Sequence, residues 1–388
     1  MSSVAVKHSP TLWNLGFRPF FLFASLFSAA SIALWTAQYA GYLPFQYLKG
    51  PPAHGSEMLF GYAMAVIAGF LFTAVRNWTG KPTPSGVTLA CIVALWVAGR
   101  VLAVTPLVLL AASANAAFAV AVATGIGIPL LRSGNRRNYF FVALLIALGG
   151  SAVALQLSFA GALEWPARAN IRVGLDLVLF IMAVMGGRVI PMFTNNGVPG
   201  AQARRNPIVE RLSLAGILVL VVADLIQLPA VAAMVLCAAL AVVHATRLLL
   251  WQPWRTLRTP LVWILHAGYA WIVIHLVLRA LAAIELVPDL LAVHALTIGG
   301  IGGLTIGMMT RTTRGHTGRP LVANRSDRWC YALVMLGALA RVAGPLALPD
   351  AYVATVIAAG VCWTTAFLTF AIAYGPSLLR PRVDGRPG

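Results

Sequence analysis

The sequence predicts an all-α integral membrane protein with about twelve transmembrane helices, and both its composition and its long apolar runs lead to this class. Of the 388 residues, 60% are hydrophobic and 10% are charged, whereas an ordinary soluble domain has roughly 25% charged residues. A membrane-spanning helix needs about 20 predominantly apolar residues, and the chain contains many such runs. Because the runs are continuous and do not alternate, a transmembrane β-barrel is excluded.

The apolar runs, broken by Pro, Gly or charged residues, divide the chain into twelve predicted helices within one polytopic membrane domain, residues 1–388. The seventh and eighth are separated only by residues 227–229. No stretch resembles a soluble domain or a long linker. The predicted helices cover residues 20–40, 56–75, 85–104, 107–131, 138–160, 173–193, 212–228, 230–250, 260–284, 289–310, 329–347 and 351–374.

The distribution of charge predicts the topology. The formal net charge is +18, and basic residues gather at alternate ends of the predicted helices, whereas Glu164, Glu285, Asp289 and Asp350 lie at the other ends. By the positive-inside rule both termini are cytoplasmic, and we expect a multi-pass protein of the bacterial inner membrane with the lipid bilayer as its partner. A nucleic-acid partner is not expected, because no soluble basic module exists to bind one. The basic clusters lie within residues 7–18, 76–81, 132–137, 204–211, 247–258, 311–328 and 380–386.

The N-terminal region and the four cysteines limit the possible targeting signals and metal sites. The first predicted helix lacks a convincing small-residue cleavage site, which indicates a retained helix and not a removed signal peptide. The four cysteines lie singly in different predicted helices, with no CxxC or CxxCH motif. Thiolate zinc sites, iron–sulfur clusters and covalently attached c-type haem are therefore not expected. We expect Cys91, Cys237, Cys330 and Cys362 to pack in the core.

Histidines at membrane depth are the most informative polar residues, because polar groups are costly there and usually face an interior or a cavity. His54 stands at the outer mouth of the second predicted helix, His294 lies about 8 Å inside the outer end of the tenth, and His275 lies in the outer half of the ninth. We expect His8, in the N-terminal tail, to be a solvated surface residue.

A second layer of histidines lies near the cytoplasmic ends. His244 and His266 are each about 9 Å from the cytoplasmic ends of the eighth and ninth helices, and His316 follows the tenth in a basic loop. His266 and His275 point about 180° apart on one helix, so they do not easily ligate one site. A lone membrane histidine is more often a packing residue than a ligand. Six of them in or beside the helices of one chain favour metal binding, because neutral imidazole is the commonest metal ligand and binds haem iron and copper well.

The second and tenth predicted helices share a pattern. Each carries a histidine near its outer end, and each is followed by an R-x-x-T-G-[KR]-P turn, at residues 76–82 and 314–320. Three pseudo-repeated units of four helices are one interpretation, and a chance match is the alternative. On the tenth helix Gly299, Gly303 and Gly307 recur every four residues, which suits either close helix packing or the approach of a flat macrocycle.

Five strings carry a family resemblance: NLGFRPFF at residues 14–21, HGSEMLFG at 54–61, GGRVIPMFT at 186–194, LHAGYAW at 265–271, and the segment 309–320. In this order they resemble the NnrS family. Its members are membrane proteins described as containing haem and copper, and they are linked to tolerance of nitric oxide in denitrifying and pathogenic bacteria. The resemblance implies non-covalent haem b and copper as cofactors, nitric oxide as a small-molecule ligand and an electron donor of unknown identity.

The resemblance also implies site residues. If His54 and His294 hold a haem, Arg18 or Arg188 can neutralise its propionates, although both lie at cytoplasmic ends and can equally anchor the chain at the interface. Glu57 can orient His54 or relay a proton, or it is an exposed first-turn acid favoured by the helix dipole. The candidate metal ligands are His54, His266, His294, His316 and, in a weaker string, His244, whereas His275 lies outside the strings.

The helix count, with histidines on helices two and ten, also resembles the catalytic subunit of haem-copper oxidases and nitric oxide reductases at the level of architecture. The sixth helix has no histidine, and the three-histidine copper cluster of those proteins has no obvious equivalent, which leaves a binuclear NO-reducing centre in doubt. Two functions stay open. One is a haem- and copper-binding protein of nitric oxide metabolism or resistance, an oxidoreductase if it is an enzyme. The other is a multi-pass transporter of a metal, haem or small anion.

Overall fold

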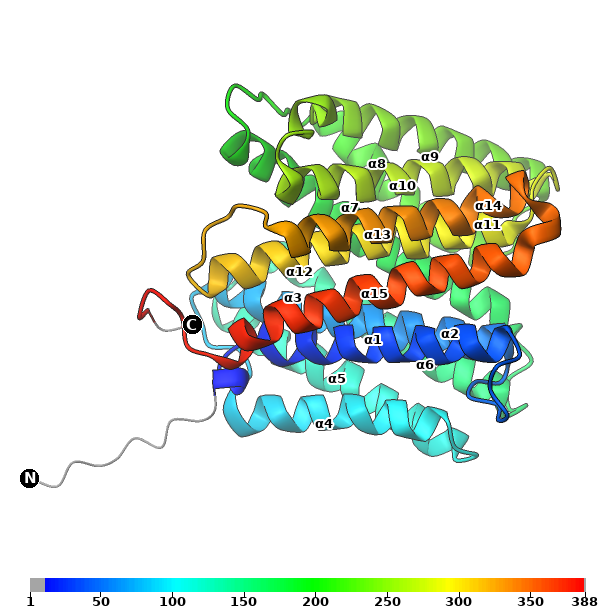
Figure 1. Cartoon of the computed structure of the whole chain (residues 1–388), viewed down its shortest axis with the longest axis horizontal. Helices are drawn as coiled ribbons and strands as arrows, with labels where there is room; N and C mark the ends of the chain where they lie inside the picture. The colour runs from blue at the N-terminus through cyan, green and yellow to red at the C-terminus, as the bar shows by residue number, and fades with distance from the viewer. Residues whose placement is uncertain (1–10, 387–388) are drawn as a thin grey trace, which may run out of the picture.

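The computed structural model describes residues 11–386, which form helices and no strand. The helices run side by side in one bundle (Figure 1). Within this range, ten helical rods are long and apolar enough to cross a membrane. The predicted all-helical class is confirmed, and ten of the twelve predicted spans meet both conditions. The other two, α8 (Pro207–Leu225) and α13 (Arg325–Val342), are of similar length but carry more charge.

Each predicted span coincides with one rod, and the ends differ by at most six residues. The second rod is α2 (Gly50–Ser56), the π-helical segment η2 (Glu57–Ala63) and α3 (Met64–Thr79), and the tenth is α11 (Asp289–His294), the π-helical segment η5 (Ala295–Gly302) and α12 (Gly303–His316). The remaining helices are α1 (Phe17–Tyr39), α4 (Gly86–Ala103), α5 (Val108–Arg132), α6 (Phe140–Phe159), α7 (Ala167–Gly197), α9 (Ala230–Leu250), α10 (Pro260–Ala283), the short α14 (Gly344–Ala347) and α15 (Tyr352–Leu379).

The second, sixth and tenth rods are the most buried, at 78%, 83% and 67% along their most apolar windows, followed by α10 at 61%, whereas α4 and α9 are 33% and 28% buried. The three most buried rods are thus four helices apart in the chain. This is the spacing that three four-helix units would give, and the repeat itself stays a prediction, because α7 has no π-helical segment.

The second and tenth rods share local geometry as well as sequence. Both contain a π-helical segment near the histidine end. At the other end, Thr79 Oγ1 donates to the Val75 carbonyl at 2.7 Å and Thr317 Oγ1 donates to the Thr313 carbonyl at 2.6 Å. Each threonine is followed by a glycine with φ near +63° or +75°, a conformation that a residue with a Cβ rarely adopts. The shared Thr-Gly pair therefore ends both rods in the same way.

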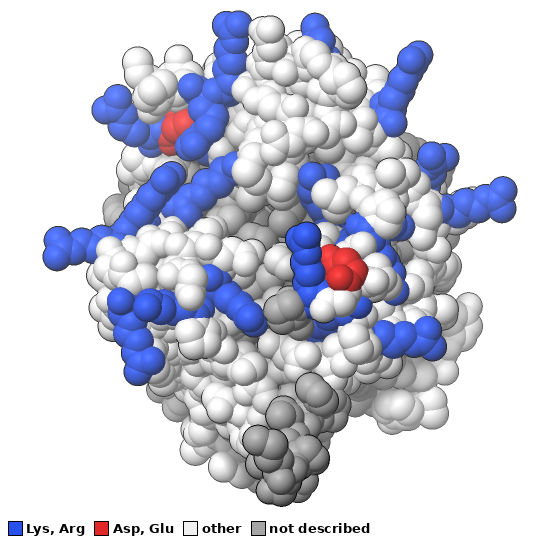
Figure 2. Space-filling model, turned by 90° about the vertical axis from the view of Figure 1, so that its left-hand side faces the viewer, with Lys and Arg blue, Asp and Glu red and all other residues white. Residues whose placement is uncertain are grey.

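The bundle has one basic end. The first and last described residues lie at the same end (Figure 1). Lys and Arg side chains gather on this face, with few Asp or Glu between them (Figure 2). We call it the basic end. Its assignment to the cytoplasm stays a prediction, as does that of the termini, and His8 lies outside the described residues.

The glycine stripe on the tenth rod packs against α10. A Cβ at Gly299 would overlap the ring of Trp271, and a Cβ at Gly303 would lie 2.9 Å from the Gly268 Cα. At Gly307 it would lie 2.8 Å from the side chain of Ile264. Since α10 occupies this face, the stripe serves close helix packing and leaves no room there for a flat macrocycle.

The cysteines are all unpaired thiols. Cys237 and Cys330 are buried and Cys362 is half-buried, as expected for core packing. The expectation is wrong for Cys91, which is exposed on α4. Helix α4 is one of the least buried rods, so an apolar side chain on it can face lipid as readily as protein.

A buried ion cluster joins three helices at membrane depth. Arg279 on α10 donates to Asp176 Oδ1 on α7 at 2.8 Å and also pairs with Asp224 on α8. The Asp176 carboxyl is almost fully buried, and its second oxygen has no hydrogen-bond partner in the described structure. Removing one partner of a buried pair leaves the other charge uncompensated, so this cluster fixes α7, α8 and α10 relative to one another.

We predict that Arg279→Gln lowers the free energy of unfolding by about 3–5 kcal/mol, because two carboxylates then share an interior without a cation. Thermal unfolding in detergent, followed by fluorescence-detected gel filtration, measures the effect. Arg172→Gln is the matched control: it breaks the partly exposed 2.6 Å pair with Asp289 and should cost less than about 1 kcal/mol. Equal losses for the two variants would contradict a structural role for the cluster.

Candidate cofactor site

His54 and His294 occupy matching positions on two neighbouring rods. His54 lies in α2 shortly before η2, and His294 is the last residue of α11, directly before η5. The rods touch further along, where Tyr62 Oη lies 2.6 Å from Thr305 Oγ1. The predicted pair therefore lies on two contacting rods, at the end of the bundle away from the chain termini (Figure 1).

Each imidazole of the pair has a ring nitrogen without a protein partner. His294 Nδ1 lies 2.8 Å from the Leu290 carbonyl oxygen, which can only accept, so Nδ1 carries the proton and Nε2 keeps its lone pair. His54 Nδ1 is buried and has no hydrogen-bond partner in the described structure. A neutral imidazole whose other nitrogen is fixed by a carbonyl is the usual form of a metal ligand. His294 has this form, and His54 offers an unpartnered nitrogen beside it.

Two side chains complete the surroundings of the pair. The Trp35 ring stacks on His54 at 4.9 Å between centroids, with the planes 6° apart. Arg341 on α13 is 7% exposed, and its charge acts on both imidazoles. One of its nitrogens donates to Tyr352 Oη at 3.1 Å, and Nη1 is buried without a partner. A buried guanidinium with a free donor beside two histidines can hold an anionic group of a cofactor.

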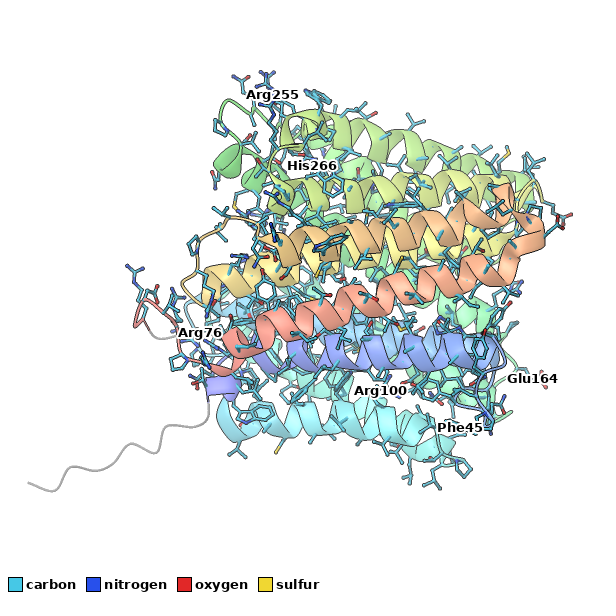
Figure 3. The ribbon with its side chains drawn as sticks, viewed as in Figure 1. Phe45, Arg76, Arg100, Glu164, Arg255 and His266 are labelled. Atoms are coloured by element: carbon cyan, nitrogen blue, oxygen red, sulfur yellow. The ribbon has the colours of Figure 1, made fainter. Side chains whose placement is uncertain are left out.

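Glu57 is bound to a partner that the sequence did not indicate. Its carboxylate accepts from Arg100 Nη1 at 3.0 Å, and both side chains are buried. Arg100 also donates to Asn115, and the two residues come from α4 and α5. Glu57 is therefore not an exposed first-turn acid. Figure 3 labels Arg100, which links the second rod to these outer helices.

Among the inner histidines, His244 belongs to a hydrogen-bonded network at α7–α10. Its Nδ1 lies 2.7 Å from Tyr269 Oη, and Arg247 donates to the same hydroxyl at 2.9 Å. Arg247 also makes two hydrogen bonds to the Glu210 carboxylate, at 2.9 and 2.6 Å. A Cβ at Gly187 would overlap the Arg247 guanidinium, so glycine makes room for the cation.

His266, labelled in Figure 3, and His316, at the end of α12, have different neighbours. His266 Nε2 lies 2.8 Å from Thr194 Oγ1, and its Nδ1 is buried without a partner. His316 packs on Phe17, with 5.6 Å between ring centroids. It is the last residue of α12 and not a loop residue as expected. Within residues 11–386, no three His, Cys, Asp or Glu side chains come together as a metal site.

Arg18 and Arg188 lie far from the His54–His294 pair. Arg18 donates from Nη1 to carbonyls at the end of α15, at 2.9–3.3 Å. It lies about 25 Å along α1 from Trp35, the neighbour of His54. Arg188 lies about 25 Å along α7 from Ile171, which faces Gly55 beside His54. Neither can neutralise a group bound at the pair, so they stay candidates only for a ligand near the basic end.

A family model described as NnrS protein matches residues 11–382 of the 388. The chain belongs to the NnrS family. No curated protein matches it. The membership confirms the resemblance carried by the five strings, and it is consistent with a membrane protein related to nitric oxide.

Several charged residues of this NnrS chain were missed by the sequence analysis. Arg100, Arg279 and Arg341 lie inside apolar runs, as do Asp176 and Asp224. The signal was available, since any ionisable side chain at membrane depth is a candidate for pairing or function. The rule that singles out the histidines holds equally for these arginines and aspartates.

We predict that Arg100→Met lowers the free energy of unfolding by about 3–5 kcal/mol, because it leaves the Glu57 carboxylate buried without its cation. The double variant Glu57→Gln/Arg100→Met should recover much of this loss, since it removes the charge as well. A double-mutant cycle of thermal unfolding in detergent measures the coupling between the two sites. Simple additivity of the two single variants would show that the ion pair does not stabilise the fold.

Proposed function

We propose that this NnrS protein binds haem b non-covalently at His54 and His294 and acts in nitric oxide metabolism or resistance. The proposal rests on one observation: His54 and His294 lie at the same end of two adjacent rods, where His54 Nδ1 and Arg341 Nη1 are buried without a partner and a backbone carbonyl orients His294. A haem offers what this arrangement lacks, which is a metal for the imidazoles and carboxylates for the guanidinium.

The protein's own residues would set the properties of the group they hold. The Leu290 carbonyl fixes the ring orientation of His294 and raises its basicity as a ligand. Arg341 lowers the cost of bringing propionates into the bundle, because its charge is already buried there. Trp35 covers one face of His54 and excludes water from that side. When bound, haem iron would supply electron transfer or binding of NO.

The number of histidines bound to one iron decides between two roles. If both His54 and His294 held one iron, the role would be electron transfer. If only one of them did, NO would have a site. Family membership favours a role connected with nitric oxide, and whether the protein is an enzyme depends on this choice.

Copper has weaker support than haem. His244 and His266 each keep one ring nitrogen without a partner, and the other nitrogen is held by Tyr269 or Thr194. In the described range these residues do not come together with a third ligand. The residues present therefore do not form a copper site by themselves. His316 packs on α1 and does not join them.

We predict that His54→Gly and His294→Gly each abolish stoichiometric haem if the two residues share one iron, because loss of one axial ligand weakens the site strongly. The Soret absorbance per polypeptide of the purified protein measures haem content. Added imidazole should restore binding in either variant. His316→Gly, at the other end of the same rod, is the control and should keep its haem.

Three outcomes would contradict the proposal. Absence of a Soret band from the wild-type protein would contradict the proposal that the protein binds haem. Transport of a substrate in proteoliposomes by haem-free protein would favour a transporter. Retention of haem in both glycine variants would refute the pairing of His54 with His294.

We also predict that Arg341→Gln accelerates the release of haem by about tenfold or more, since a charge-assisted hydrogen bond contributes roughly 1.5–3 kcal/mol. Transfer of haem to apomyoglobin, followed by absorbance, measures the rate. Arg328→Gln is matched to it, because Arg328 is an exposed arginine of the same helix. Equal release rates for the two variants would exclude Arg341 as a propionate partner.

A further inference from the structure

A basic pocket opens at the basic end, where four segments of the chain meet. Its volume is about 410 Å³, which lies within the range of about 300–1,000 Å³ typical of small-molecule sites. One wall comes from the end of α3 and another from the α5–α6 connection. The rest comes from α7 and from the segment before α8. The lining residues are Trp78, Asn135, Arg137, Asn138, Arg188 and Arg205.

Three arginines line this pocket, and no acidic side chain does. Arg205 is partly neutralised by Glu210, at 3.0 Å. Arg137 and Arg188 have no ion pair with an acidic residue anywhere in the described part of the chain. The charges of Arg137 and Arg205 both act on Arg188. Three mutually repelling cations around one cavity favour an anion between them.

The wall of the pocket is held in place by a chain of hydrogen bonds. Arg188 Nη1 donates to Asn138 Oδ1 at 2.6 Å, and Asn138 Nδ2 donates to Asn135 Oδ1 at 3.0 Å. Asn135 Nδ2 in turn donates to the Trp78 carbonyl at 3.4 Å. Asn138 is buried. The chain therefore fixes the direction of the guanidinium before any ligand arrives, which lowers the cost of binding.

Aromatic rings support the same guanidinium from behind. Arg188 Cζ lies 5.7 Å from the Trp78 ring centroid and 5.8 Å from the centroids of Phe140 and Phe141. Stacking on ring faces stabilises a cation without using its N–H donors. The donors that do not reach Asn138 stay available to the pocket, because no other hydrogen bond from Arg188 is formed within residues 11–386.

We propose that this pocket is a binding site for a phosphate group, carried by an anionic lipid headgroup or by a soluble phosphate compound. Planar guanidinium forks match the oxygens of phosphate in a bidentate way, and the two amides add further donors. The volume exceeds what a halide would fill. The site lies at the opposite end from His54 and His294, so it does not depend on the proposed haem.

Two measurements on the full-length protein separate the sources of phosphate. In the first, protein is reconstituted in vesicles of equal parts phosphatidylcholine and phosphatidylglycerol, extracted, and analysed for retained phosphatidylglycerol by native mass spectrometry. In the second, inorganic phosphate is titrated into delipidated protein by calorimetry, with nitrate at equal ionic strength as the comparison anion. We expect retention in the first for a lipid site, and binding of phosphate over nitrate in the second for a soluble ligand.

Variants decide whether the pocket is the site. Arg137→Gln should weaken binding by about ten- to a hundredfold, the loss of one hydrogen bond to a charged group. Arg188→Gln should do the same if the protein still folds. Arg137 is exposed, so its loss leaves the fold intact. Its neighbour Arg136 is equally exposed but does not line the pocket, and Arg136→Gln is the control. Equal effects of Arg136→Gln and Arg137→Gln, equal binding of nitrate and phosphate, or no binding in either measurement would overturn the proposal.

Discussion

A charge inside a lipid bilayer must find its partner within the protein, because no water is present to solvate it. This constraint explains how the rods of the bundle are fixed. The Arg279 cluster joins α7, α8 and α10, and Arg100 joins the second rod to α4 and α5 through Glu57 and Asn115. Apolar packing alone does not choose between helix neighbours in lipid, since the tails are as apolar as the side chains. The buried ions contribute to that choice, together with the close glycine packing of the tenth rod against α10.

The same constraint makes the exceptions informative. Where a buried nitrogen has no protein partner, as at His54 and at Arg341 Nη1, its cost has to be met by something that the chain itself does not supply. These two atoms lie at the same end of the molecule and close to His294. A missing partner at these two groups, on either side of the candidate site, points to one external ligand and not to two separate defects.

The π-helical segments help to place this site. An α-helix that widens to a π turn shifts the register of every residue on one side of it, and such segments are frequent at functional sites. Here η2 begins three residues after His54, and η5 begins directly after His294. The histidine end of each rod is therefore rotated relative to the part of the rod that follows its π-helical segment. The basic pocket, by contrast, is built from ordinary helix ends and loops at the other end. The candidate haem site and the basic pocket therefore lie at opposite ends of the bundle.

The sequence by itself determined the helical class and nearly all helix positions, because runs of apolar residues long enough to span a bilayer have no other stable arrangement. It also singled out His54 and His294, through their positions on two rods that share an R-x-x-T-G-[KR]-P turn. Only the tertiary structure decided the partners. Glu57 pairs with Arg100 across 43 residues of chain, and Arg188 lies at the opposite end from the histidine pair. Which helix lies beside which follows from packing and ion pairing between segments distant in sequence, and no local pattern encodes those contacts.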